Sequence, residues 1–131
     1  MKPVQKPYPK IYMAAFAPKA LQRVATMTDG WIPVAIPIDD MVQMFGTLKD
    51  IAKQAGRDPS ELEMVVRGNL EITANPLTDG RGIFQGTPEQ IHEDVAQCAK
   101  IGADEVIFDV LFQENSLAGW LRMLEQCRKW V

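Results

Sequence analysis

The sequence has little of the chemistry from which metal sites and nucleophile sites are built. Its 131 residues include one histidine, His92, and two cysteines, Cys98 and Cys127. So few ligands cannot form a metal site or a nucleophile–histidine–acid triad within one chain. We therefore expect no metal. Cys98 and Cys127 lie in predicted helices and are expected to be reduced, half-buried thiols, and His92 is expected to be exposed on its helix.

Strong charge and long apolar runs are also missing. The net charge of −3 provides neither the basic footprint of a nucleic-acid-binding protein nor a basic membrane stripe. No apolar run approaches the roughly 20 residues that span a bilayer. Met1–Lys10 lacks the apolar stretch of a secretory signal, and no glycine-rich phosphate loop of the P-loop or Rossmann type is present. The expected partners include neither nucleic acid nor membrane, and the expected location is the cytoplasm.

The sequence does contain a fourfold alternation of strand-like and helix-like segments. The predicted strands are Lys10–Phe16, Gly30–Ile36, Met64–Thr73 and Glu105–Phe112. The predicted helices are Pro18–Thr28, Asp39–Gly56, Thr87–Gly102 and Ser116–Trp130. Because each helix returns the chain to begin the next parallel strand, the pattern predicts an α/β fold with a parallel sheet. Four such βα units are half of a (β/α)₈ barrel.

We accordingly predict one half-barrel domain over residues 1–131. The apolar share of 47% suits an ordinary core. Three prolines make residues 1–10 an extended strap, because proline excludes helix at and before its own position. An isolated half-barrel leaves two strand edges and one sheet face open, and open edges invite pairing. We therefore expect two copies to close head to tail into a homodimer. A separate chain that supplies the missing half is the alternative partner.

Helix boundaries carry their own signals. Asp39 is expected to cap the second helix and Gly56 to end it. Asp58, with Pro59 and Glu61 after it, predicts a short helical turn before the third strand. Thr87 to Gln90 form a capping box, and Gly102 ends that helix. The last helix has one apolar side, made of Leu117, Trp120, Leu121, Leu124, Cys127 and Val131.

Polar residues alternate along the third strand. Arg67, Asn69 and Glu71 share one face, and the opposite face is apolar and suits the covering helices. The polar face should then point into the barrel, where Asp109 of the fourth strand can meet Arg67. Two interpretations remain open. These residues form a buried ion pair that closes the interior, or they are the polar floor of a ligand pocket.

Two segments lie where α/β folds bind ligands, at the carboxyl ends of the strands. The longest loop, Asn75–Gly86, follows the third strand. The segment Ala14–Leu21 turns from the first strand into a helix N-terminus, where small residues allow backbone N–H groups to approach an anion. The second pattern is weak alone, since most strand–helix turns bind nothing.

These residues also carry a family resemblance. The stretches are Lys6–Ala15, Ala20–Ala25, Thr28–Pro33, Gly56–Pro59, Gly86–Ile91 and Gly102–Glu105. In this order they resemble the C-terminal half of bacterial luciferase-like monooxygenases, and more narrowly the branch that uses a deazaflavin coenzyme in place of FMN. The most specific signatures are Asp29–Trp31 and Gly86–Gln90. Together the stretches cover nearly the whole chain.

The resemblance implies a (β/α)₈ barrel that binds FMN or a deazaflavin at the carboxyl ends of its strands. It implies cofactor contacts at the first turn and the start of the second strand, namely Ala14, Ala15, Phe16, Ala17, Gly30 and Trp31. The family usually has two glycines where this chain has Ala14 and Ala15, and the added methyl groups crowd a phosphate. The family's N-terminal half, which holds much of the ring pocket, is absent, so no catalytic residue is carried over.

Three functions follow from this sequence. The first is a flavin- or deazaflavin-dependent oxidoreductase assembled from two half-barrels. The second is a non-catalytic binding or structural half-barrel that homodimerises. The third is a fragment whose partner is another chain. The sequence leaves open the substrate, the flavin, the activity of the isolated chain and whether Met1 is a natural start.

Overall fold

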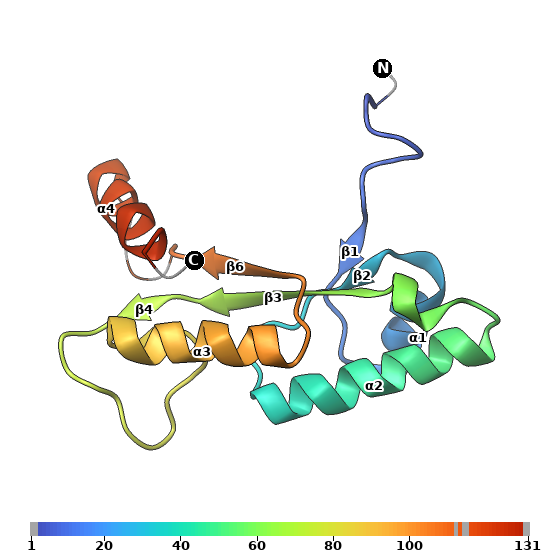
Figure 1. Ribbon diagram of the computed structural model, residues 1–131, viewed down its shortest axis with the longest axis horizontal. Helices are drawn as coiled ribbons and strands as arrows, with labels where there is room; N and C mark the ends of the chain where they lie inside the picture. The colour runs from blue at the N-terminus through green and yellow to red at the C-terminus, as the bar shows by residue number, and fades with distance from the viewer. Residues whose placement is uncertain (1–2, 112, 114–115, 130–131) are drawn as a thin grey trace.

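The computed structural model describes residues 3–111, 113 and 116–129. Its strands are β1 (Tyr12–Met13), β2 (Gly30–Trp31), β3 (Glu63–Asn69), β4 (Glu71–Ile72), β5 (Gln85–Gly86) and β6 (Glu105–Asp109). Its helices are α1 (Pro18–Met27), α2 (Ile38–Gln54), the 3₁₀ turn η1 (Pro59–Glu61), α3 (Pro88–Lys100) and α4 (Leu117–Cys127). In Figure 1, α2 and α3 lie along one side of β3, and α4 lies beyond the tip of β6.

The main sheet is parallel throughout, with the strand order β1-β2-β3-β6. Tyr12, Gly30 and Glu63 are in register across the first three strands, and Val65 faces Glu105 across the last two. Each strand follows its predecessor through a helical connection, which is the βα arrangement that the sequence predicted. The parallel α/β fold is therefore confirmed.

The strands are shorter than predicted, and two interruptions have identifiable causes. Pro33 has no N–H to donate, so β2 ends at Trp31 and the ladder resumes only as a single bridge between Val34 and Arg67. The predicted third strand divides after Asn69. Its continuation, β4, leaves the main sheet and pairs in parallel with β5, which the sequence had placed in a loop. Phe112, the predicted end of the fourth strand, lies outside the described residues.

Most of the predicted helix signals are confirmed. The Asp58 side chain accepts a hydrogen bond from Ser60 N and caps η1, and Thr87 and Gln90 form the capping box of α3. Gly56 and Gly102 have positive φ values of 78° and 82° just after α2 and α3. Residues with a Cβ atom rarely adopt this backbone conformation. The prediction that Asp39 caps α2 was wrong. The helix begins one residue earlier, so Asp39 lies in its first turn.

The core lies between the sheet and helices α1 to α3. Trp31 is fully buried and stacks on Phe45 of α2 with 6.5 Å between ring centroids. On the other side of the core, Phe84 meets Phe108 edge to face at 5.2 Å. These aromatic contacts link the sheet to α2 and to the loop before α3. The remaining fully buried large side chains are Met41, Leu48, Met64, Leu70, Ile91, Val24, Val65 and Val66.

Helix α4 is the least enclosed helix. The Ser116 side chain accepts from Gly119 N and caps it, and Met123 and Cys127 face the core. Trp120 of the predicted apolar side is partly buried, whereas its three leucines are exposed, with Leu117 at 71%, Leu121 at 53% and Leu124 at 56%. Trp130 and Val131, the predicted end of this helix, lie outside the described residues.

Both cysteines are free and more deeply buried than predicted, and burial raises the pKa of the Cys98 thiol to about 11. His92 is exposed, as predicted. Across residues 3–111, 113 and 116–129, no helix is long and apolar enough to cross a membrane.

Candidate functional site

The turn after β1 presents small residues at the start of α1. Ala14, Phe16 and Ala17 are exposed, whereas Ala15 is buried and its carbonyl oxygen accepts the indole N–H of Trp31 at 2.9 Å. Helix α1 begins at Pro18 without a side-chain cap and has no acidic residue in its first turn. Its positive dipole end therefore faces solvent next to an open turn, an arrangement that suits an anion.

Gly30 and Trp31 do not contribute to this surface. The Trp31 side chain is fully buried on the helix side of the sheet, with its indole bound to Ala15 and its ring against Phe45. Gly30 is buried in register with Tyr12 and Glu63, and a Cβ there would overlap the Glu63 backbone. Close packing requires both residues where they are, and cofactor contact at Gly30 and Trp31 stays a prediction.

Gly30 also makes room for a hydrogen-bond network on the open face of the sheet. The Tyr12 hydroxyl reaches across the glycine and donates to Glu63 Oε2 at 2.6 Å, and Lys10 pairs with Oε1 of the same carboxylate. The hydrogen bond to Glu63 raises the pKa of Tyr12 to about 12, while Lys10 and then Tyr12 lower the pKa of Glu63. This network lies at the amino end of the strands, away from the α1 turn.

Arg67 and Asp109 meet on the open face, as the sequence predicted. The Arg67 guanidinium donates to Asp109 Oδ2 across β3 and β6, although Arg67 is in register with Ile107. The backbone N–H of Leu111 donates to Asp109 Oδ1 at 3.0 Å, and this bond, followed by Arg67, lowers the pKa of Asp109. Asp109 is thus a carboxylate held by one cation and one backbone donor.

Asn69 lies two residues after Arg67 on β3, and its side-chain oxygen lacks a hydrogen-bond donor among the described residues. This Oδ1 atom is buried. A buried carbonyl oxygen without a donor costs about 1–3 kcal/mol, so it marks a place for an N–H or O–H group. Asn69 borders a hollow of about 360 Å³ that is also lined by Leu70, Glu71, Gln85 and Gln113.

Glu71 lies apart from the other three predicted floor residues. It belongs to β4, where its backbone N–H donates to Phe84 O at 3.0 Å, and its side chain is exposed at the rim of the Asn69 hollow. The sequence indicated one continuous strand, and the switch of β4 to a second sheet moves Glu71 off the face shared by Arg67 and Asn69. Gln113 was not foreseen. Its side-chain amide bonds both backbone groups of Ile72, at 2.8 and 2.7 Å.

The loop from Asn75 to Gly86 is pinned rather than free. Arg81 makes a bidentate pair with Asp94 of α3 at 2.7 and 2.8 Å, and Asp94 also accepts the backbone N–H of Phe84. Asp94 is 4% exposed and holds the loop against α3. The Gln90 side chain bonds both backbone groups of Leu77. The one arginine of the loop is therefore committed to a structural ion pair.

A larger hollow, about 740 Å³, lies at the opposite end of the sheet, around Asp29 and Arg57. Its charged groups are already paired. Arg57 donates to the carbonyl oxygens of Ala25 and Thr28 at the end of α1, and Lys10 pairs with Glu63. Parallel α/β folds bind ligands at the carboxyl ends of their strands, so the smaller hollow beside Asn69 is the better candidate. No cluster of three metal-ligating side chains occurs among the residues that the structure describes.

Comparison with known families settles the class of protein. The family model for luciferase-like monooxygenases matches residues 1–77, more than half of the chain. The chain belongs to the luciferase-like monooxygenase family. No curated protein sequence matches it.

Solved structures of luciferase-like enzymes share the fold at low sequence identity. A coenzyme F420-dependent tetrahydromethanopterin reductase from Methanopyrus kandleri has a TM-score of 0.59 at 15% identity, over 74% of this chain and 44% of the reductase. The long-chain alkane monooxygenase LadA has a TM-score of 0.64 at 12% identity, over 90% and 39%. Riboflavin lyase RcaE, solved with a modified FMN and riboflavin, has 0.65 at 11%, over 91% and 43%.

The luciferase-like chain thus spans about two fifths of the length of each of these structures. Its four parallel strands and their helices form half of a (β/α)₈ barrel, as predicted.

Proposed function

We propose that this half-barrel holds the anionic end of a flavin or deazaflavin coenzyme and supplies part of the polar floor of an oxidoreductase site. The proposal is supported by the family and by the cofactors named for its structural neighbours, F420 for the reductase and a modified FMN for the lyase. The observation that carries it is the open N-terminus of α1 after the turn Ala14–Ala17. A ligand phosphate there would meet backbone N–H groups and the helix dipole.

The residues present fit such a group at two places. At the α1 end, the exposed turn carries only small or apolar side chains, and Lys19 in the first turn adds a positive charge. At the pocket floor, the buried Asn69 Oδ1 lacks a donor, which a ring or ribityl N–H or O–H would supply. When bound, the coenzyme would supply the hydride or oxygen chemistry of the family.

The chain's own side chains would position and orient the ligand. Arg67 and Asp109 keep a fixed charged pair on the open face, and Asn69 offers its acceptor to one side of them. Glu71 lines the hollow and Asp109 is in register with Asn69, yet the Asp109 carboxylate already accepts hydrogen bonds from Leu111 N and Arg67. We assign no catalytic residue on this chain, because the other half of the barrel completes the site.

A second candidate is a half-barrel module without turnover, which binds an anion or serves structure only. Ala14 and Ala15 favour it, because they replace the glycines that let the backbone approach a phosphate closely. The buried, fixed position of Ala15 strengthens that argument, since its carbonyl oxygen is tied to Trp31. The two candidates differ in whether a bound flavin is reduced and reoxidised.

Titration of the full chain with FMN and with riboflavin, followed by flavin fluorescence, tests the proposal. The two ligands share the ring and differ in the phosphate, so we expect FMN to bind at least about tenfold more tightly. Lys19→Glu should remove that preference, whereas Lys53→Glu on the last turn of α2 serves as a matched control. Equal binding of the two flavins, or no binding of either, would overturn the phosphate site.

Reduction of the bound flavin separates the enzyme from the module. We would add a reduced nicotinamide to the complex and follow the visible absorption band of FMN. Loss of this band shows that the bound FMN is reduced and supports the oxidoreductase. A complex that binds FMN with a phosphate preference and is not reduced supports the module. The same titration with F420 decides between the two coenzymes.

A further inference from the structure

We propose that a second copy of this chain completes the barrel, with β1 of each copy lying parallel beside β6 of the other. The pairing would complete the proposed cofactor site. The evidence for it is independent of that site and consists of the strand edges and exposed surfaces described below. Two junctions related by a two-fold axis would close eight main strands, which is the strand number of the family's barrel.

Both outer strands have an unpaired edge. Among the described residues, β1 pairs only with β2, and β6 pairs only with β3. Each therefore presents backbone N–H and C=O groups along one side. Such edges are rarely left uncovered in parallel sheets, because parallel strands are usually buried on both faces and flanked by other strands.

Exposed apolar side chains gather at these two edges. At the β1 edge, Ile11 is 55% exposed and Phe16 is 48% exposed. At the β6 edge, Ile107 is 38% exposed and Leu111 is 64% exposed, and α4 adds its exposed stripe of Leu117, Leu121 and Leu124. A stripe of three leucines on one side of a helix is the pattern of a face that packs against another element.

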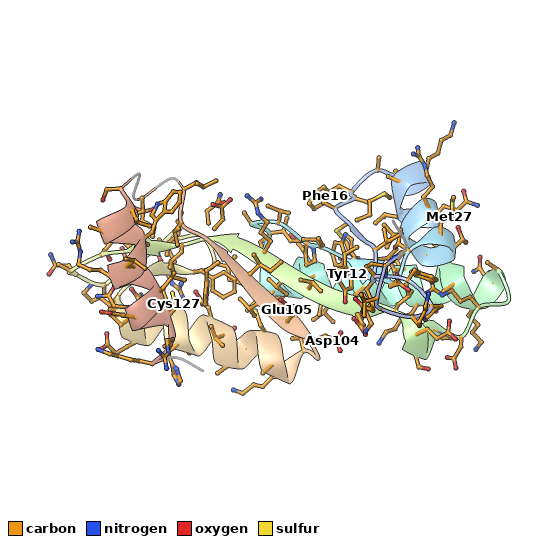
Figure 2. The ribbon with its side chains drawn as sticks, turned by 90° about the horizontal axis from the view of Figure 1, so that it is seen from above. Tyr12, Phe16, Met27, Asp104, Glu105 and Cys127 are labelled. Atoms are coloured by element: carbon orange, nitrogen blue, oxygen red, sulfur yellow. The ribbon has the colours of Figure 1, made fainter. Side chains whose placement is uncertain are left out.

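Parallel alignment places exposed apolar side chains opposite one another. At the amino ends of the strands, Lys10 is already paired with Glu63 of its own chain, so the match between the two edges lies at the carboxyl ends. Figure 2 shows Tyr12 of β1, Asp104 and Glu105 near the middle of the molecule, with Phe16 on the β1 side and Cys127 of α4 at the far end. At the carboxyl ends, Phe16 of one copy would face Leu111 and the α4 stripe of the other.

The surface area agrees with an absent partner. The chain exposes 8597 Å². A compact monomer of 14.7 kDa exposes about 6,900 Å². The excess of about 1,700 Å² is shared between the extended segment before β1 and the open edges. A stable homodimer buries about 1,000 Å² or more on each partner, which this excess can supply.

A second copy supplies four more parallel strands, which brings the main strands to the eight of a (β/α)₈ barrel, and its edges carry the same exposed apolar side chains.

Light scattering of the purified full chain tests the pairing. We expect a molar mass twice that of the 14.7 kDa chain. Leu121→Asp and Ile11→Asp, from opposite edges, should each raise the dimer dissociation constant by at least about tenfold, because each places a charge in an apolar junction. Val42→Asp on α2, where Val42 is 50% exposed, is the matched control and should leave the mass unchanged.

A monomeric mass at high protein concentration would overturn the pairing and point to a different chain as partner. A dimer that survives both edge variants while they remain folded by circular dichroism would also overturn it. The mass does not depend on flavin, so a dimer that binds no flavin refutes only the proposed function, and a flavin-binding monomer refutes only the pairing.

Amide hydrogen exchange locates the interface. The outer-edge amides of β1 and β6 should become protected as protein concentration rises, together with the α4 stripe. Concentration-dependent protection confined to α2 would show a dimer of another kind and contradict the edge pairing.

Discussion

Arg67 on β3 donates to the carboxylate of Asp109 on β6, diagonally across two neighbouring parallel strands. The pair lies on the face of the sheet opposite α1, α2 and α3, in a hollow that Trp120 of α4 also lines. The Asp109 side chain is 10% exposed and Arg67 is 35% exposed, so the ion pair is only partly shielded from water. Because Asp109 also accepts from Leu111 N, the pair fixes the turn that leads from β6 toward α4.

Asp109→Ala should lower the free energy of unfolding by about 2–3 kcal/mol, because it leaves Arg67 and Leu111 N without their acceptor. Arg67→Ala should cost less, since Asp109 keeps its backbone donor. A double-mutant cycle in urea should give a coupling of about 1 kcal/mol. Additive losses within error would show that the two side chains do not interact.

Gly68→Ala should destabilise the protein by about 1–3 kcal/mol, because an added Cβ would overlap the ring of Phe84. Phe84 is fully buried and its ring packs edge to face on Phe108, so the ring has little room to move away. Gly46→Ala is the matched control. Nothing lies within 4 Å of its Cβ position inside α2, and the change should stabilise the helix by about 0.5–1 kcal/mol. Thermal unfolding of both variants measures the two stability changes. Equal changes in Gly68→Ala and Gly46→Ala would refute the predicted overlap with Phe84.

Asp94→Asn should destabilise the chain by about 3 kcal/mol, because it leaves the half-buried Arg81 without a carboxylate partner. The equivalent change at an ion pair whose carboxylate is exposed, Glu61→Gln beside Arg57, should cost no more than about 0.5 kcal/mol, because Arg57 keeps its backbone acceptors. Urea unfolding gives both values. Limited proteolysis should also cut the loop from Asn75 to Gly86 faster in Asp94→Asn. An unchanged cleavage rate would show that the Arg81–Asp94 ion pair does not hold the loop against α3.

The acid stability of the protein should depend on Glu63. Lys10, followed by Tyr12, lowers the pKa of Glu63 below its ordinary 4.5 in the folded state. The unfolded chain therefore binds a proton at Glu63 before the folded chain does. The stabilisation is present above about pH 4.5 and is lost as the pH falls through the lowered folded pKa.

Urea midpoints measured from neutral pH down to about pH 3 should fall less steeply in Glu63→Gln than in the parent chain. Tyr12→Phe should give an intermediate slope, because it removes one of the two donors to Glu63. If the urea midpoints of the parent chain and of Glu63→Gln fall equally steeply with pH, Glu63 does not contribute to the acid dependence of stability.

The sequence by itself determined the order and type of the elements. Apolar spacing and capping residues such as Asp58 and Thr87 act within a few residues, so the helices lie close to their predicted positions. Alternation along β3 also predicted the meeting of Arg67 and Asp109, because neighbouring parallel strands bring same-face residues together.

Only the tertiary structure decided where local signals compete with long-range pairing. The departure of β4 from the main sheet depends on β5, which pairs with it from more than ten residues away and carries no strand pattern of its own. The burial of Trp31 follows from packing against Phe45, and the α4 leucines are exposed because no element among the described residues covers that side. Local patterns specify elements, whereas contacts between distant segments decide which faces are covered.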